Sequence, residues 1–184
     1  LWELDRDLAS ARHFPAISWI DSYTGYLDSV GRWWQENVAD DWIELHEQAM
    51  DILHREDRLQ QIVELVGPDV LADDQRLVLL TARLLKEGLL QQNALDEVDT
   101  FATPDKQVKL LRAILVFHRE ARRAIKDGCP LAAMQELPLV PRLMRLKSTV
   151  PNDEVERLDD VIDEIHRAFD EVRRECQAGP GGRR

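Results

Sequence analysis

The sequence predicts an all-α fold: a multi-helix array with a long helical hairpin and a C-terminal amphipathic helix. Apolar residues recur at spacings of three and four over long stretches, which is the period of one helical face. Glycine and proline, eight of each in 184 residues, fall mostly between these stretches. Hydrophobic residues make up 44% of the chain and charged residues 32%, which is the balance of an ordinary folded domain.

The first long helix is predicted from about residue 40 to residue 66. Asp40 or Asp41 can cap its start, and the Gly-Pro pair at 67–68 ends it. Its apolar positions keep helical spacing and form the predicted inward face: Trp42, Leu45, Ala49, Ile52, Leu53, Leu59, Ile62, Val63 and Val66.

A second helix is predicted over residues 73–87, with Gly88 as its terminator. Its inward positions are Leu77, Leu80, Leu84 and Leu85. Only a short acidic turn at 67–74 separates it from the first helix, so the two form a hairpin. Residues 40–76 contain eleven acidic and three basic residues, which makes the hairpin strongly negative.

A third helix is predicted to begin at Thr103-Pro104-Asp105, because this order supplies an N-cap, a proline at the first helical position and an acid in the first turn. It runs to Asp127, and Gly128 ends it. Its inward positions are Val108, Leu111, Leu115 and Ile125. The prolines that follow, at 130, 138, 141 and 151, leave room for short helices only.

The last helix is predicted over about 153–176, and its apolar residues alternate steps of three and four: Val155, Leu158, Ile162, Ile165, Phe169, Val172 and Cys176. Two interpretations fit this stripe. The helix docks on its own domain, or it pairs with a coiled-coil partner, as in a stand-alone helical protein-interaction module. We expect residues 1–150 to form one helical domain, 151–177 the amphipathic helix and 178–184 a disordered tail.

Composition excludes several function classes. Basic residues number 24 against 35 acidic ones, for a net charge of −11, which argues against nucleic acid as the partner. No apolar run reaches the ~20 residues needed to insert into a membrane. The sequence contains no phosphate-binding Gly-Lys loop, no zinc-hydrolase, Cys-x-x-Cys or Gly-x-Ser-x-Gly motif, and its histidines are scattered. We therefore expect no catalytic residue, cofactor site or metal ligand within this chain.

Three separated stretches carry a resemblance: RHFPAISW at 12–19, LQQIVELVGPD at 59–69 and LQQNALDEVD at 90–99. In order and spacing they resemble the C-terminal region of the catalytic A subunit of archaeal/vacuolar-type (A/V-type) rotary ATP synthases. The likeness covers residues 1 to about 150. Together with the absence of an initial methionine, it implies a C-terminal piece of a longer subunit whose phosphate-binding loop precedes Leu1.

The resemblance implies that the whole subunit interconverts ATP and ADP, with magnesium, while ions are moved by rotation. It implies two kinds of partner, the central-stalk subunits and the nucleotide-binding B subunit. It also implies a cytoplasmic place at the periphery of the membrane. The chain alone is expected to be inactive, because it lacks the phosphate-binding loop.

The resemblance also implies site residues. Phe14 stands where the family stacks an aromatic ring on the adenine base, and Leu89 and Leu95 stand at the second wall of that pocket. The family carries aromatic residues at both of those ends, so this chain departs from the pattern there. The hairpin turn stands where the family contacts the rotor: Gly67, Pro68, Asp69, Val70, Leu71, Asp73 and Asp74.

Overall fold

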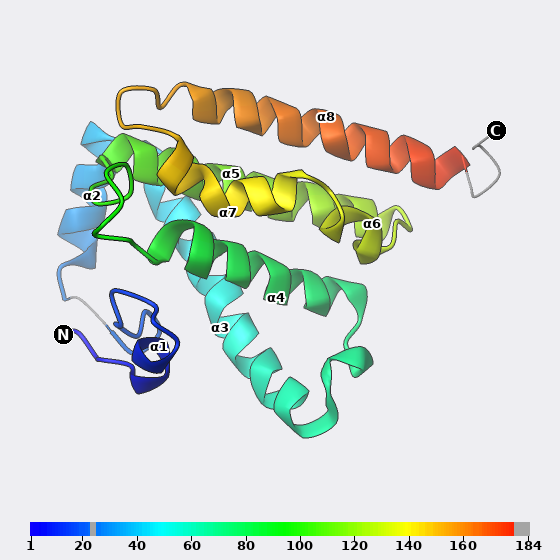
Figure 1. The fold of residues 1–184 in the computed structure, drawn as a ribbon, viewed down its shortest axis with the longest axis horizontal. Coiled ribbons are helices and arrows are strands. Elements are labelled where there is room, and N and C mark those ends of the chain that lie inside the picture. The colour runs from blue at the N-terminus through cyan, green and yellow to red at the C-terminus, as the bar shows by residue number, and fades with distance from the viewer. Residues whose placement is uncertain (23–24, 179–184) are drawn as a thin grey trace.

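Helix α5 (Pro104–Lys126) lies at the centre of the fold, with the other long helices packed around it (Figure 1). The computed structural model describes residues 1–22 and 25–178. The long neighbours of α5 are α3 (Trp42–Val66), α4 (Asp73–Leu85), α7 (Leu139–Thr149) and α8 (Arg157–Ala178). Ala113, Ala121 and Ala124 of α5 have no exposed surface, and these small side chains let neighbouring helices approach closely. The predicted all-α class is confirmed.

The start of α5 follows the sequence prediction. The Thr103 side chain accepts a hydrogen bond from the Lys106 amide, and Pro104 occupies the first helical position. The helix ends at Lys126, and Gly128 then adopts a positive φ of 90°. The chain reverses through this turn into two short helices, α6 (Leu131–Gln135) and α7, as the prolines predict.

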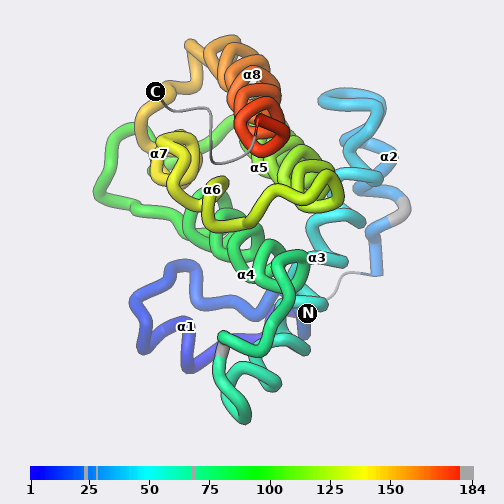
Figure 2. Tube along the Cα trace, turned by 90° about the vertical axis from the view of Figure 1, so that its right-hand side faces the viewer, coloured from blue at the N-terminus to red at the C-terminus, as the bar shows by residue number. Residues whose placement is uncertain are grey.

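Helices α3 and α4 form the predicted hairpin, joined by Gly67 and the 3₁₀ turn η1 (Pro68–Val70). The joined end reaches away from the bundle (Figures 1 and 2). The inward face predicted for α3 holds at Leu45, Ile52, Leu53 and Leu59, which are buried. It fails in the last turns, where Ile62 and Val66 are exposed, because the far end of α3 extends past the bundle that covers its first half.

Two terminus predictions need correction. Gly88 does not stop the second helix: α4 passes directly into a π-helical turn, η2 (Lys86–Leu90), which contains it. Gly88 lets the α7 backbone approach closely there, since a Cβ would lie 3.2 Å from the Leu143 carbonyl oxygen, which is a tight contact. Asp41 occupies the N-cap position of α3, but its carboxylate caps no amide; it accepts from Arg112 of α5 at 2.6 Å.

The apolar stripe of α8 packs along α5, so the docked interpretation is the one the structure supports. Leu158, Ile165 and Phe169 are buried, and the Phe169 ring meets Phe117 of α5 edge-on at 5.3 Å. This leaves no free stripe on α8 for a coiled-coil partner. The helix begins at Arg157 rather than near residue 153, because residues 151–156 form turns.

A buried ion pair also joins α8 to α5. Glu120 of α5 accepts from Arg173 at 2.9 Å, with Arg123 and His166 beside it. Burial alone would raise the pKa of Glu120, but the Arg173 hydrogen bond and the neighbouring positive charges together lower it.

The N-terminal part contains α1 (Arg6–Ser10) and α2 (Leu27–Asn37). Within the described ranges, no helix combines the length and apolarity that crossing a bilayer requires. The predicted tail, apart from Ala178 at the end of α8, lies outside the described residues.

Candidate functional site

The segment that carries Phe14 folds back on itself at the N-terminal end of the chain. An antiparallel bridge pairs Leu4 with Ile17, where the Asp5 amide donates to the Ala16 carbonyl at 3.0 Å. The Asp5 carboxylate caps α1. Phe14 lies on the return of this loop with 56% of its surface exposed, so it is accessible to a partner or ligand.

His13 anchors this segment to the end of α4. Its Nε2 lies 3.1 Å from the Lys86 carbonyl oxygen, and its ring meets Trp19 edge-on at 5.3 Å. The Lys86 ammonium contacts the buried carboxylate of Glu56 on α3 at 2.7 Å and lies 5.5 Å from the centre of the Trp19 ring. These four residues tie the Phe14 segment to both helices of the hairpin. Sequence reasoning missed this cluster, and its one local signal was the histidine next to Phe14.

The loop that carries Leu95 is tied to Phe14 through the backbone. The Gln92 amide donates to the Phe14 carbonyl at 2.7 Å, so two segments almost eighty positions apart meet here. Buried Asp99 accepts from the Asn93 amide at 2.8 Å and fixes the loop's shape. Leu95 is 95% exposed. The structure thus brings the segments of Phe14 and Leu95 together, with both side chains at the surface.

Leu89 has a different environment. It lines a partly open pocket of about 350 Å³ between α2, α3, η2, α5 and α7. In the wall of this pocket the Trp34 ring stacks on the Trp42 ring with their centres 5.5 Å apart, and the Trp42 ring stacks on the His46 ring with their centres 5.2 Å apart. Leu89 is therefore partly buried in the bundle, unlike the two exposed side chains.

The hairpin turn divides into a buried and an exposed part. Leu71 is buried in the core, and the Asp73 carboxylate accepts from the Leu131 amide of α6 at 2.8 Å. Asp69, Val70 and Asp74 are exposed, whereas the side chain of Pro68 lies outside the described residues. Of the predicted rotor-contact residues, Asp69, Val70 and Asp74 are thus available to a partner.

Apolar residues at the end of α3 extend this exposed surface. Leu65 is 85% exposed, and Ile62, Val66 and Val70 are also exposed. Sequence reasoning missed Leu65 and placed Ile62 and Val66 in the core, because helical spacing alone does not tell where the covering helices stop. We call Ile62, Leu65, Val66, Val70 and the adjoining acids Asp69 and Asp74 the hairpin tip.

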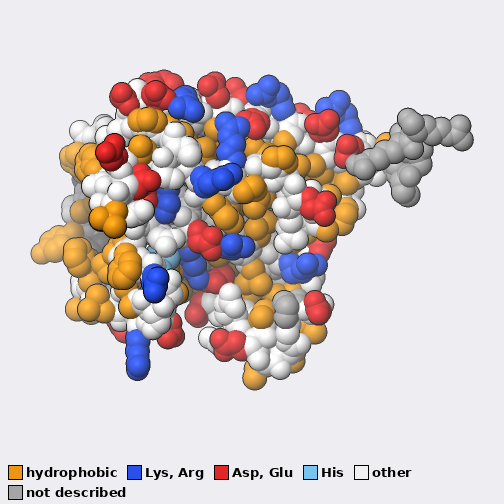
Figure 3. All heavy atoms as spheres, viewed as in Figure 1, with side chains coloured by type: hydrophobic (Ala, Val, Ile, Leu, Met, Phe, Trp, Pro, Cys, Tyr) orange, Lys and Arg blue, Asp and Glu red, His pale blue; other side chains and the backbone are white. Residues whose placement is uncertain are grey.

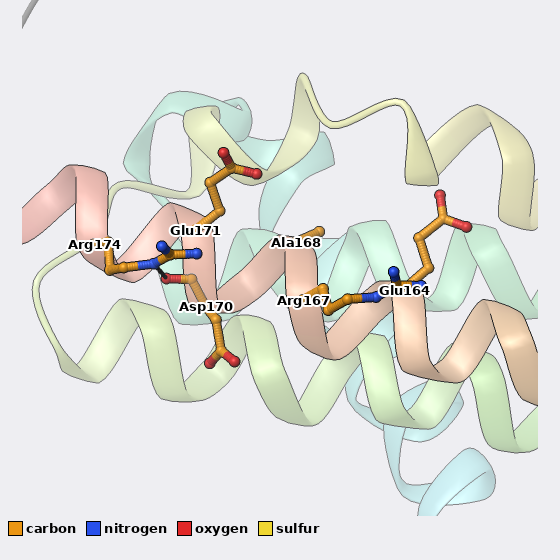
Figure 4. A pocket seen from close by; sticks show the side chains of 6 residues that line it. All are labelled: Glu164, Arg167, Ala168, Asp170, Glu171 and Arg174. Atoms are coloured by element: carbon orange, nitrogen blue, oxygen red, sulfur yellow. Dashed lines mark hydrogen bonds between the residues drawn. The ribbon is translucent and has the colours of Figure 1, made fainter.

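Two other hollows are lined by both acidic and basic side chains. Figure 4 shows the outer face of α8, where acids and bases of one helix line a shallow depression and Arg174 donates to the Asp170 carbonyl. A groove between α3 and α5 places Asp51 and Arg55 opposite His118 and Arg122. Within residues 1–22 and 25–178, no three His, Cys, Asp or Glu side chains are arranged to hold a metal ion. By contrast, hydrophobic side chains gather at the surface over the N-terminal segment (Figure 3).

Comparison with known proteins gives a consistent set of relatives. Residues 31–135 match the family described as the C-terminal domain of V and A type ATP synthase. The chain is 44% identical over 171 residues to the V-type ATP synthase alpha chain of Halothermothrix orenii, and 44% identical over 172 residues to the A subunit of the A-type ATP synthase of Methanopyrus kandleri. Identity to the corresponding A subunit of Thermococcus onnurineus is 43% over 171 residues. Each match covers 93% of this chain and 29% of the relative, so the chain spans less than a third of those proteins.

Proposed function

Because the chain belongs to the family of C-terminal domains of V and A type ATP synthases, we propose that it works as the helical part of the A subunit of a rotary ATP synthase. The observation that carries this proposal is the match over residues 31–135, which spans α3, α4 and α5. The whole subunit would interconvert ATP and ADP while ions are moved, at the periphery of a membrane, beside a central stalk and a nucleotide-binding B subunit.

In this proposal, Phe14 and Leu95 form one wall of the adenine pocket. Two observations support it: the Phe14 side chain is exposed, and the Gln92–Phe14 hydrogen bond holds the Leu95 loop beside it. Stacking of an aromatic ring on a base contributes about 1 to 3 kcal/mol of binding free energy. Leu89 would support this loop from the partly open pocket that it lines.

Phe14→Ala in the whole subunit tests the adenine wall. Stacking acts equally on the ground state and the transition state, so we expect a higher KM for ATP and a smaller change in kcat. Leu4→Ala, an exposed apolar change in the same segment, is the matched control and should leave KM unchanged. An unaltered KM in a correctly folded Phe14→Ala variant would remove Phe14 from the pocket.

The hairpin tip is the proposed contact to the rotor. Two packed helices make a stiff arm, and its end presents apolar side chains next to carboxylates, which suits a partner surface that is both apolar and basic. The arm's other end adjoins the Phe14 segment through Glu56 and Lys86. A displacement at the nucleotide would thus reach the tip along α3.

Replacing residues 67–70 by a flexible Gly-Ser segment tests mechanical coupling. In the reassembled complex, ATP hydrolysis should continue while ion pumping per ATP falls, because a flexible end absorbs displacement. Asp69→Asn with Asp74→Asn should reduce coupling less, since exposed charges are screened within about 8 Å at physiological salt. Wild-type coupling in the Gly-Ser variant would contradict the proposal.

The chain by itself should bind ATP weakly and hydrolyse none. Most nucleotide affinity comes from groups around the phosphates and magnesium, and the family motif for these is absent from the sequence. Calorimetry with Mg-ATP checks this, and micromolar affinity would contradict it.

A further inference from the structure

The fold brings the ends of α5 and α8 together, and each end carries a cysteine. Cys129 follows Gly128 in the α5–α6 connection, and its amide donates to the Ala124 carbonyl at 2.9 Å, which fixes its backbone. Cys176 lies near the end of α8. Figures 1 and 2 both show the end of α8 beside the α5–α6 connection. Both cysteines are free thiols.

Two contacts set the position of the sulfur atoms. The buried Cys129 Sγ lies 4.0 Å from the Val172 carbonyl oxygen of α8. Cys176 is four residues after Val172, so it lies one helical turn further along the same face. The Cys129 sulfur thus lies beside the turn of α8 that carries Cys176, although 47 positions separate the two cysteines in the sequence.

We propose that Cys129 and Cys176 form a reversible disulfide, a covalent modification site that fastens the end of α8 to the α5–α6 connection. The oxidant class is a small-molecule disulfide. This assignment is independent of the proposed rotary function, because it depends only on the contact between α8 and the rest of the domain.

The different exposure of the two thiols sets the order of reaction. Cys176 is half-buried and reachable from solvent, whereas burial, together with the neighbouring Cys176, raises the pKa of the Cys129 thiol to about 12. Cys176 thiolate attacks one sulfur of the small disulfide, whose S–S bond breaks and releases one thiolate. The Cys129 sulfur then attacks the Cys176 sulfur of the mixed disulfide, and its proton passes to the second departing thiolate. Two protein thiols are oxidised, and one small disulfide is reduced to two thiols.

The bond would restrain the unfolded chain more than the folded one. It closes a loop that contains α6, α7 and α8, and a loop of this length restricts the unfolded ensemble strongly. We expect the oxidised chain to unfold at a temperature about 5 to 10 °C higher than the reduced chain.

The test is equilibration of the purified chain in glutathione buffers of increasing oxidised-to-reduced ratio. Free thiols are then blocked with iodoacetamide, and intact mass and peptide mapping follow. The expected result is a Cys129–Cys176 cross-linked peptide that disappears on reduction, with an increase in unfolding temperature that follows its yield.

Two single variants keep the test decisive. Cys129→Ser should accumulate glutathione on Cys176 and show no increase in unfolding temperature, whereas Cys176→Ser should react little at the buried Cys129. The double variant controls for oxidation elsewhere. If the folded wild-type chain instead carries glutathione on Cys176 without the internal cross-link, or forms the cross-link only in denaturant, the proposal is overturned.

Discussion

Helix α8 and the far end of α3 present similar apolar stripes, yet only one of them is covered. On α8 the stripe lies against α5, and Phe169 has no exposed surface. On α3 the stripe continues past the bundle, so Ile62 and Val66 face solvent at the hairpin tip, with exposed Leu65 beside them. The two stripes differ in neighbours rather than in pattern. The stripe of α8 is buried within this chain, whereas the exposed stripe at the hairpin tip leaves a surface for a partner.

The largest expected effect is the difference in stability loss between one substitution in each region. Phe169→Ala should lower the free energy of unfolding by about 4 kcal/mol, because it removes a fully buried ring and leaves a cavity beside Phe117. Leu65→Ala, the matched change at the tip, should alter it by no more than about 0.5 kcal/mol. Urea unfolding of both variants measures the difference. A large loss in Leu65→Ala would show that the tip is part of the core.

A second variant examines the polar support of the covered stripe. Arg173→Met should lower the free energy of unfolding by about 3 kcal/mol, because it leaves the buried carboxylate of Glu120 without its closest partner. The pKa of Glu120 is lower in the folded chain than in the unfolded chain. Its ionised carboxylate therefore stabilises the folded state above the ordinary Glu pKa of about 4.3, and this stabilisation is lost as the pH falls through the lowered value. Acid unfolding of wild type should therefore be steeper than that of Glu120→Gln. Equal slopes would contradict this assignment.

The base of the hairpin gives a smaller, pH-dependent effect. His118 of α5 lies 2.7 Å from the hydroxyl of Thr81 on α4, and burial, with Arg55 and Arg122 nearby, lowers its pKa to about 4. Asp51 opposes this shift. Between the unfolded pKa of about 6.5 and this value, only the unfolded chain takes up the proton, so stability falls as pH decreases.

From pH 7 to pH 5 the loss attributable to His118 should be about 2 kcal/mol. Denaturant unfolding at the two pH values in wild type and His118→Gln isolates it, since the variant lacks the titrating group. If both proteins lose the same free energy, His118 does not join α5 to the hairpin as a neutral side chain.

The smallest effect concerns the shape of the tip. Gly67→Ala should lower the free energy of unfolding by about 1 kcal/mol, because φ is +85° there and an L side chain strains that backbone. The space around an added Cβ is empty, so no steric clash adds to this loss. Gly25→Ala, also in open space but without a positive φ, is the matched control and should be neutral or slightly stabilising. Thermal unfolding compares the two. A neutral Gly67→Ala would show that the turn adapts its backbone.

Sequence patterns predicted the long helices well and their surroundings less well. Thr103-Pro104 located the start of α5, since a cap and a proline act through local geometry. Gly88 was misjudged as a stop signal, because its role is to admit the α7 backbone, a contact over fifty positions away. Ile62 was placed in the core because helical spacing shows which residues share a face of a helix. It does not show how far along the helix other helices pack against that face.

The candidate site was predictable only where a motif carried it. Phe14 and Leu95 came from the family resemblance, and the structure brings their segments together through the Gln92 amide. The contact of Lys86 with Glu56 and His13 left no periodic signal, because it joins three separate segments by single atoms. Whether Phe14 and Leu95 contact adenine stays a prediction.

Lys86 also limits how the two proposed functional ends can evolve. Its carbonyl receives His13 of the Phe14 segment, and its ammonium contacts Glu56 of α3. A substitution at this position would remove the ammonium that contacts Glu56, whereas the backbone carbonyl that receives His13 would remain. Residue 86 therefore holds the Phe14 loop through its backbone and the hairpin through its side chain, so the choice of amino acid at this position can tune the hairpin while the loop keeps its anchor.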